Sequence, residues 1–503
     1  MSPQLAALTG RLGLPLSMLA AALVFRSLSF VPAVIDTDEG LYIVQAREWL
    51  AGTWPLIGVW DMHPIGAPAL AALALMLPMP VILAIRLAGA MAVAGTGTAL
   101  VVLARALGLA PVPAYGAGIL SVALTVNLGG LATNTEILFA PFAVTAIAIA
   151  AREAVAALDE GEAPRTGALI AAGLLVGIAL TIKTIAFFEG CFVFAVIVGA
   201  GLVSRELPLR RVPFLALVYA AACGFPTFVI AAAYAMQGAF GVFLDVWFIA
   251  PFRYVGARIA FRDAAWMVVS VVLFLAWPFA LAAATLLPGA GVARPARFGA
   301  AWLVVAALSV AAPGMFFNHY FLILLPPLSL LAASGAWALA GVIMPARPWL
   351  LASVMLGVLA LNSWVADAAR RVELGPGFRR ADPVRQVAEA VRNAVPPGST
   401  IYIANYHPVV YVLADMALPT RFVFPAHLAG WYAGVTGIDA DAEVARVLAA
   451  RPAAIVVDRG WWTAIRPPLR PVIEAALARD YVFHARVLEA NGPVEIHRLR
   501  ETP

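Results

Sequence analysis

The sequence has 503 residues, of which 63% are hydrophobic and 12% are charged, and its formal net charge is +5. Soluble domains contain about 45–50% apolar residues, so this composition excludes a soluble protein and indicates a polytopic membrane protein. The mean hydropathy of +0.92 agrees. The small positive charge lies in short loops between apolar segments, where it predicts membrane topology, and we expect no nucleic-acid partner.

Apolar segments fill the first three quarters of the chain and predict an α-helical fold of about 11–13 transmembrane helices. The candidate crossings are 12–31, 82–107, 112–128, 137–151, 167–183, 187–203, 213–236, 264–287, 298–312, 320–342 and 349–366. A further segment, 65–79, is short and bounded by prolines, so it either crosses the membrane or enters it as a half-helix. Together residues 1–366 are expected to form one transmembrane domain.

Arginines are concentrated in alternate loops between these segments. They are Arg105, Arg152, Arg165, Arg205, Arg210, Arg211, Arg294, Arg297 and Arg347. Because basic loops remain in the cytoplasm, this alternation predicts a multi-pass membrane protein whose basic loops all lie on the cytoplasmic face. The acidic loop 34–64 and everything after residue 366 are then expected on the opposite face.

The acidic loop begins with Asp-Thr-Asp-Glu-Gly at residues 36–40. Aspartate accepts hydrogen bonds from free backbone N–H groups and suits the positive end of the helix dipole, so a helix is predicted from here to Leu50. Its pattern is amphipathic, which favours a helix lying at the membrane surface with aromatic side chains at the interface. These aromatic residues are Tyr42, Trp49, Trp54 and Trp60.

Asp38 and Glu39 are the strongest candidates for catalysis. A partly desolvated carboxylate near the membrane interface can act as the general base for an acceptor hydroxyl. Capping of the helix explains the group less well, because a cap needs one carboxylate and Asp36 can supply it. The alternative is a solvated loop whose carboxylates only keep it out of the bilayer.

His63 follows Asp61 closely in the sequence Asp-Met-His-Pro. Its imidazole can bind a phosphate as a cation or hold a metal ion jointly with a carboxylate. One histidine among scattered acids does not define a metal site, so no metal ligand is assigned and a divalent cation stays optional. We expect Asp61 and Tyr42 to contact substrate. For His63, the alternative is a histidine that only faces water.

Four further polar residues lie at the ends of apolar segments. Lys183 can extend to lipid headgroups, or it can offset the charge of a leaving phosphate. Arg86 is a second, weaker candidate for the phosphate contact. Glu136 and His319 are candidate substrate contacts, although either can be structural.

The composition changes after residue 366, and residues 367–503 are expected to form a small α/β domain that caps the membrane site. Helices are predicted at 382–395, 407–414, 439–450 and 471–480, and strands at 400–404, 454–458, 481–489 and 493–497. No glycine-rich phosphate loop follows a strand, so a nucleotide-binding fold has no support.

Several short motifs occur in an order that is similar to that of the GT-C superfamily of membrane glycosyltransferases. They are Asp38-Glu39-Gly40-Leu41-Tyr42, Trp60-Asp61-Met62-His63-Pro64-Ile65-Gly66, Arg86, Asn134-Thr135-Glu136, Lys183 and Asn318-His319-Tyr320-Phe321. Within the superfamily the chain resembles the bacterial branch related to protein O-mannosyltransferases and the lipid A aminoarabinose transferase. That branch often has Asp-x-Lys-Pro-Pro-Gly in the second motif, so His63 and Ile65 are departures.

The resemblance implies transfer of a sugar from a polyprenyl-phosphate donor to a lipid, glycan or protein acceptor at the periplasmic membrane face. It implies Asp38 as the base and places His63, Lys183 and Arg86 near the donor phosphate. A lipid-linked oligosaccharide ligase or polymerase is the alternative enzyme. A lipid-linked sugar transporter is disfavoured, because ionisable residues cluster at helix ends and not near the bilayer midplane. A non-catalytic scaffold would not require the acidic loop.

Overall fold

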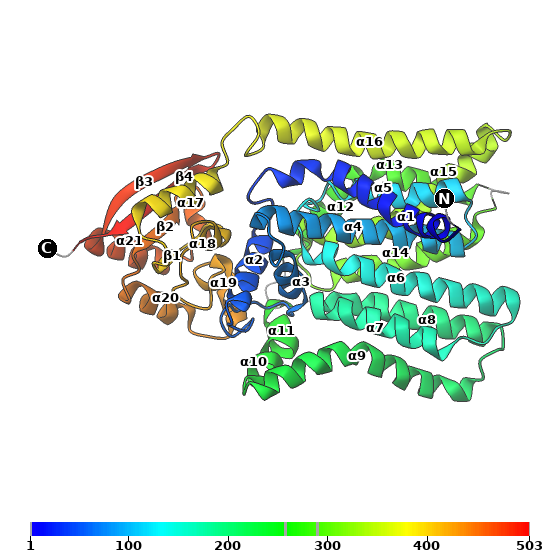
Figure 1. The fold of residues 1–503 in the computed structure, drawn as a ribbon, viewed down its shortest axis with the longest axis horizontal. Coiled ribbons are helices and arrows are strands. Elements are labelled where there is room, and N and C mark those ends of the chain that lie inside the picture. Colours follow the sequence, from blue (N-terminus) through cyan, green and yellow to red (C-terminus); the bar gives the residue numbers. More distant parts are fainter. Residues whose placement is uncertain (1–2, 256–258, 288–290, 502–503) are drawn as a thin grey trace. The chain divides into compact units, whose positions relative to one another are not determined.

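The computed structural model describes residues 3–255, 259–287 and 291–501, and the chain forms two compact units (Figure 1). The helical unit consists of Met1–Leu28, Arg86–Ala233 and Ile259–Ala369. The mixed unit consists of Ser29–Ile85, Tyr234–Arg258 and Arg370–Pro503. Residues far apart in the sequence therefore fold together in each unit.

Long apolar helices make up the helical unit. They are α1 (Pro3–Phe25), α4 (Val81–Ala106), α5 (Pro111–Leu124), α6 (Thr135–Val155), α7 (Thr166–Ile182), α8 (Phe187–Val203), α9 (Val212–Met236), α12 (Phe261–Phe274), α13 (Ala276–Ala283), α14 (Ala293–Ala311), α15 (Leu325–Ile343) and α16 (Pro348–Leu374). Every predicted apolar segment coincides with one of these helices, which confirms a multi-pass α-helical membrane protein.

The predicted number of 11–13 crossings stays a prediction, because helix length and composition show only which helices are long enough to span a bilayer. Among the described residues, six helices are long and apolar enough to cross a membrane, or seven if the pair α12–α13, bent by 69°, is one span. The prediction of 11–13 also counted shorter apolar helices, such as α5 and α7. Hydropathy alone finds the apolar segments, but it does not find where turns shorten the helices within them.

Basic loops lie at one end of the helical unit. At this end, Arg294 pairs with Asp159 at 2.7 Å and Arg165 pairs with Glu153 at 2.5 Å, so two of the basic loops meet there. Glu136 lies at the opposite end of α6, which has 21 residues. At 1.5 Å per residue this helix separates the two ends by about 30 Å.

Two short helices belong to the mixed unit: α2 (Thr37–Leu50) lies within the acidic loop, and α3 (Gly66–Leu75) directly follows it. The predicted helix at the start of the loop is confirmed, with Asp36 as its N-cap. Helix α3 has ten residues. It is about 15 Å long and cannot span a bilayer core of about 30 Å, so the segment 65–79 does not cross.

The interfacial position predicted for Tyr42 and Trp60 is wrong. Tyr42 is 3% exposed and Trp60 is 1% exposed. Helix α18 (Val409–Leu413) packs against α2, and the Trp60 ring lies 5.8 Å from the ring of Phe422. The covering surface comes from more than 350 positions further along the chain, so the local pattern could not reveal it.

The remaining elements of the mixed unit form a four-stranded sheet with helices. The helices are α10 (Phe240–Leu244), α11 (Ala250–Val255), α17 (Pro383–Ala394), α18, α19 (Pro425–Leu428), α20 (Ala440–Ala449) and α21 (Leu469–Asp480), and the strands are β1 (Ile401–Ile403), β2 (Ala454–Asp458), β3 (Tyr481–Glu489) and β4 (Gly492–Leu499). Each helix and strand predicted after residue 380 is present. The predicted domain boundary at 366 falls within α16.

The strand order is β1-β2-β4-β3. Strand β1 is parallel to β2, and β4 is antiparallel to both β2 and β3. Strands β1, β2 and β3 therefore all run in the same direction. Strand β2 is buried along its whole length, as its apolar sequence predicts for a strand covered on both faces.

Asp382 joins the acidic loop to this sheet region. Its Oδ2 accepts a hydrogen bond from the Ala33 N–H at 2.7 Å, and its Oδ1 accepts from Val384 N–H and Arg385 N–H at 3.0 and 3.2 Å. One buried carboxylate thus caps α17 and holds the chain at the start of the loop.

We expect Asp382→Ala to lower the stability of the mixed unit by about 2–4 kcal/mol, because it removes a helix cap and leaves the buried Ala33 N–H without an acceptor. Asp439→Ala is the matched control. Asp439 caps α20 through Asp441 N–H and Ala442 N–H only, so its loss should cost about 1 kcal/mol. Thermal unfolding of the full chain in detergent measures both, and equal shifts would show that the Ala33 contact contributes nothing.

Candidate active site

Asp38 lies in the first turn of α2. Asp36 accepts the hydrogen bond from Asp38 N–H at 3.1 Å and so caps the helix, and the cap therefore does not require the Asp38 carboxylate. Asp38 is half-buried, whereas Glu39 is 2% exposed. Of the two predicted catalytic carboxylates, Asp38 is therefore the one that a substrate can reach.

His63 is held by Asp61. The ring Nδ1 of His63 lies 3.2 Å from both carboxylate oxygens of Asp61, and Met62 N–H donates to Oδ1 at 2.7 Å. Burial of Asp61 acts to raise its pKa, but the attraction and hydrogen bond of His63 outweigh this and lower the pKa. The Tyr42 ring meets the imidazole edge-on at 6.5 Å. This arrangement orients the imidazole and leaves Nε2 as the ring nitrogen for a ligand.

His427 is a neighbour of this group that the sequence did not predict. It is 6% exposed, and its ring lies 5.5 Å from Trp60 and 4.8 Å from Phe424. Burial lowers the pKa of His427 to about 4, the charge of Asp61 opposes this shift, and His63 adds to it. His427 is therefore neutral at pH 7. Nothing in the local sequence signals that this histidine is buried.

The predicted residues of the helical unit form a second group. Lys183 follows the last residue of α7 and forms a buried ion pair with Glu136, in the first turn of α6. Thr135 donates to the other oxygen of Glu136 at 3.0 Å. The ammonium of Lys183 also lies 4.2 Å from the centre of the Tyr320 ring, which His319 meets edge-on at 5.0 Å.

This packing shows that Lys183 is buried and does not reach for lipid headgroups. A carboxylate and an aromatic face offset the cost of burying a lysine. The predicted substrate contact Glu136 is its partner. His319 is half-buried beside them.

Arg86 contacts the turn that precedes α6, and its predicted phosphate contact stays a prediction. It is fully buried, and its Nη1 donates to the Leu131 carbonyl at 3.1 Å. Arg26 donates to the same carbonyl at 2.9 Å and also to the Gly130 carbonyl. The two guanidinium groups hold the turn that precedes α6.

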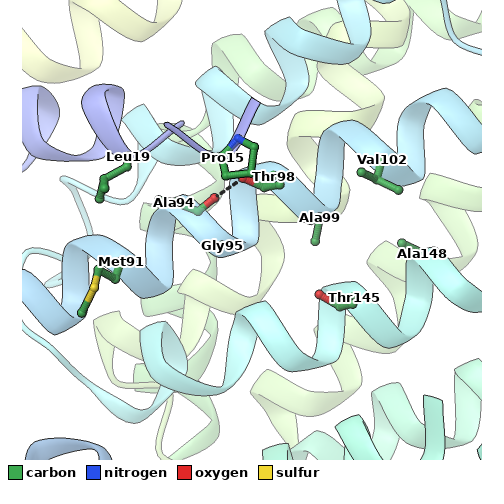
Figure 2. Close-up of a pocket in the computed structure, with 10 residues that line it drawn as sticks. All are labelled: Pro15, Leu19, Met91, Ala94, Gly95, Thr98, Ala99, Val102, Thr145 and Ala148. Atoms are coloured by element: carbon green, nitrogen blue, oxygen red, sulfur yellow. Dashed lines mark hydrogen bonds between the residues drawn. The ribbon is translucent and has the colours of Figure 1, made fainter. Parts of the chain in front are cut away.

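Two apolar hollows lie in the helical unit. One, of about 410 Å³, is lined by residues of α1, α4 and α6 (Figure 2). Its few polar atoms are occupied locally; the Thr98 hydroxyl donates to the Ala94 carbonyl at 2.8 Å. The other, of about 660 Å³, lies between α7, α8 and α9 and includes both cysteines, Cys191 and Cys223. Both have the apolar lining that a lipid chain requires.

The predicted residues therefore fall into two groups, one in each unit. The mixed unit holds Asp38, Glu39, Tyr42, Asp61 and His63, and the helical unit holds Arg86, Glu136, Lys183 and His319. Within residues 3–255, 259–287 and 291–501, no three His, Cys, Asp or Glu side chains are grouped as ligands for a metal ion. The optional divalent cation stays a prediction.

We expect the mixed unit to lose stability as the pH falls from about 6.5 toward 4. In this range the unfolded chain protonates His427 and the folded chain does not, so His427 contributes about 3 kcal/mol of the loss near pH 4; His407, whose pKa burial also lowers to about 4, adds to it. His427→Gln should reduce the dependence of the unfolding temperature on pH between 6.5 and 5. His484→Gln, at an exposed position, should leave it unchanged. An unaltered slope for His427→Gln would contradict the assignment.

The sequence matches no known family profile and no curated protein sequence. The structure is similar to crystal structures of ArnT from Cupriavidus metallidurans. With undecaprenyl phosphate bound to that protein, the TM-score is 0.65 at 16% identity, over 97% of this chain and 98% of that one. In its apo state the TM-score is 0.57 at 15% identity, over 98% of each chain.

An oligosaccharyltransferase from Archaeoglobus fulgidus has a TM-score of 0.55 at 11% identity, over 98% of this chain and 75% of that one. Both neighbours are GT-C proteins. The similarity extends over nearly the whole chain. At this level of identity it shows the fold alone. The chain therefore has the GT-C fold, as the order of its sequence motifs predicted.

Proposed function

We propose that this protein is a glycosyltransferase that moves a sugar from a polyprenyl-phosphate donor to a lipid, glycan or protein acceptor. The observation that carries the proposal is the position of the half-buried Asp38 carboxylate in the first turn of α2, a helix that Asp36 caps. The GT-C fold and the undecaprenyl phosphate bound by the ArnT neighbour support it. The apolar hollows of the helical unit are suited to a polyprenyl chain.

In the proposed reaction, Asp38 accepts the proton of the acceptor hydroxyl as that oxygen forms a bond to the anomeric carbon of the sugar. The bond between this carbon and the phosphate oxygen breaks, and polyprenyl phosphate leaves. A general base in this role contributes about 10²–10⁴-fold to the rate. Glu39 is too buried to replace Asp38 directly.

The leaving phosphate requires cations, and two groups are suited to supply them. His63 of the mixed unit is oriented by Asp61, and Lys183 of the helical unit forms an ion pair with Glu136. We propose each of them separately as a candidate for the donor phosphate contact, with Arg86, which donates to the Leu131 carbonyl, as a weaker candidate. Each charge-assisted contact is worth about 1.5–3 kcal/mol.

The reaction is assigned to the periplasmic face of a bacterial inner membrane. The proposal is supported by the basic loops that meet at one end of α6, the end that the positive-inside rule predicts to be cytoplasmic. Glu136 and Lys183 lie at the opposite end of that helix. A diphosphate-linked oligosaccharide donor is the second candidate, favoured by the similarity to the archaeal oligosaccharyltransferase.

Asp38→Asn should abolish transfer without unfolding the protein, because it removes the base and keeps the side chain's shape. In a deletion strain, mass spectrometry of envelope glycolipids and glycans would identify the species that the wild-type gene restores. Asp38→Asn should restore at most about a hundredth of it. Asp36→Asn is the matched control, since asparagine also caps helices and should restore the product fully. Full restoration by Asp38→Asn would exclude this residue as the base.

Loss of Lys183 alone would leave the buried Glu136 carboxylate without its cation and reduce the amount of folded protein. The double variant Lys183→Met with Glu136→Gln removes both charges and should fold. If Lys183 contacts the donor phosphate, this variant should still lower turnover by about 10- to 100-fold. Normal turnover by the folded double variant would limit Lys183 to a structural role.

His63→Lys should retain activity, because a lysine there keeps a cation beside Asp61. His63→Ala should lose about 10- to 100-fold in turnover, as expected for one lost charge-assisted contact. The measurement is the order of the two variants in the restoration assay described for Asp38. Equal inactivity of both would favour a steric or metal-binding role for the imidazole.

A further inference from the structure

Three strands of the mixed unit end at the same edge of the sheet. Since β1, β2 and β3 run in the same direction, the residues that follow or close them are brought together there. Asn405 follows β1, Asp458 closes β2 and Glu489 closes β3. The carboxyl ends of parallel strands are the usual place for a ligand in α/β sheets.

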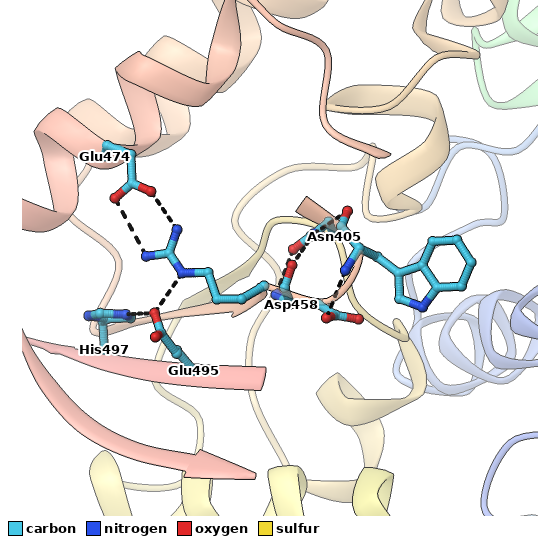
Figure 3. Close-up of polar contacts among 7 residues, drawn as sticks. Asn405, Asp458, Glu474, Glu495 and His497 are labelled. Atoms are coloured by element: carbon cyan, nitrogen blue, oxygen red, sulfur yellow. Dashed lines mark hydrogen bonds and ion pairs between the residues drawn. The ribbon is translucent and has the colours of Figure 1, made fainter. Parts of the chain in front are cut away.

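Asn405 fixes this edge. Its Nδ2 donates to the carbonyl oxygens of Asp458 and Trp461 at 2.8 and 3.1 Å, and its Oδ1 accepts from Asp458 N–H at 2.8 Å (Figure 3). Asp458 Oδ1 in turn accepts from Trp461 N–H at 3.1 Å. The Asn405 amide thus fixes the backbone of Asp458 and Trp461, and in this way it positions their carboxylate and indole.

A close approach of two loops brings the third strand end to the same place. A Cβ at Gly460 would lie 2.7 Å from the backbone carbon of Asn491, in the turn between β3 and β4. Only glycine permits this contact between the turn after β2 and the β3–β4 hairpin. It sets Glu489, to which Tyr406 donates its hydroxyl, near Asp458.

A cavity of about 430 Å³ opens at this edge, within the range of about 300–1,000 Å³ that holds small ligands. Asp458, Glu489 and His407 line it together with two indoles. Trp431 is 62% exposed and Trp461 is 54% exposed, which is unusual for the largest apolar side chains in a folded domain.

The lining specifies the chemistry of a ligand. Indole faces pack against the C–H face of a sugar ring, and carboxylates accept hydrogen bonds from its hydroxyl groups. No Lys or Arg lines the cavity in the described part of the chain, and Asp458 and Glu489 would repel an anion. The cavity is therefore suited to an uncharged saccharide and unsuited to a phosphate.

One residue that lines the cavity is the neighbour of the candidate base in the sequence. Thr37 lines it, and the Thr37 hydroxyl lies 3.2 Å from Nδ1 of His407. Thr37 directly precedes Asp38 in α2. The cavity therefore reaches the first turn of α2, the turn that contains Asp38.

We propose that this cavity, lined by Trp431, Trp461, Asp458 and Glu489, binds an uncharged saccharide that belongs to the acceptor. The inference rests on the proposed glycosyltransferase function and narrows its acceptor to a glycan or a glycosylated molecule. Transfer requires Asp38, whereas saccharide binding requires only the cavity, so the two can fail separately.

The test is a glycan array probed with the full-length protein in lipid nanodiscs, with empty nanodiscs as background. We expect wild-type protein to bind uncharged saccharides, and Trp461→Ala and Asp458→Asn to lose at least tenfold in apparent affinity. Asparagine at 458 retains the oxygen that accepts from Trp461 N–H, so the fold should survive.

Two variants serve as controls. Trp462→Ala removes the neighbouring tryptophan, which contacts the Arg459 guanidinium and does not line the cavity, and it should bind as wild type. Asp38→Asn should also bind within twofold of wild type while transfer is lost. Binding that disappears in Trp461→Ala but not in Trp462→Ala supports the cavity.

Three outcomes would overturn the inference: no uncharged saccharide above background, binding of anionic glycans only, or equal binding by all variants. In the first case the exposed indoles would be anchors for lipid headgroups. If Asp38→Asn still abolished transfer in cells, the proposed function would stand without this acceptor site. If the cavity bound saccharide and Asp38→Asn restored the envelope product, the assignment of the base would fail alone.

Discussion

The arrangement of the mixed unit depends on the carboxylate of Asp382. By accepting from Ala33 N–H and from the first turn of α17, it ties the beginning of the acidic loop to a domain 349 positions away in the chain. Helix α2 then packs on α18, and Trp60 N–H donates to the Arg421 carbonyl at 2.8 Å. The orientation of Asp38, His63 and the cavity residues follows from this long-range closure.

Much of the fold could be predicted from local physical chemistry. The buried strand Ala454–Asp458 and the caps Asp36 and Asp439 have short-range signals, and the structure has the elements they predict. The motif order from Asp38 to Tyr320 was enough to identify the GT-C fold. These signals succeed because apolar runs, capping side chains and motif spacing act within a few residues.

The partners of the candidate residues could not be predicted in the same way. Nothing near Trp60 in sequence signals that Phe422 and His427 cover it, and nothing near Lys183 signals Glu136, 47 positions earlier. The contact of Arg86 with the Leu131 carbonyl also has no local signal, because its acceptor is a backbone atom 45 positions away. The strands that end at or just before Asn405, Asp458 and Glu489 could be predicted from the sequence. That these residues meet at one edge follows only once the directions of the strands are known.

The buried pair of Lys183 and Glu136 also bears on how the chain enters the bilayer. An unpaired charge adds about 2.5–3.5 kcal/mol to the cost of insertion at the centre of a membrane helix. Glu136 and Lys183 instead lie at adjoining ends of α6 and α7, which are consecutive and packed together. Insertion of these two helices as one hairpin would bring the opposite charges together, so that each helix supplies the counterion of the other.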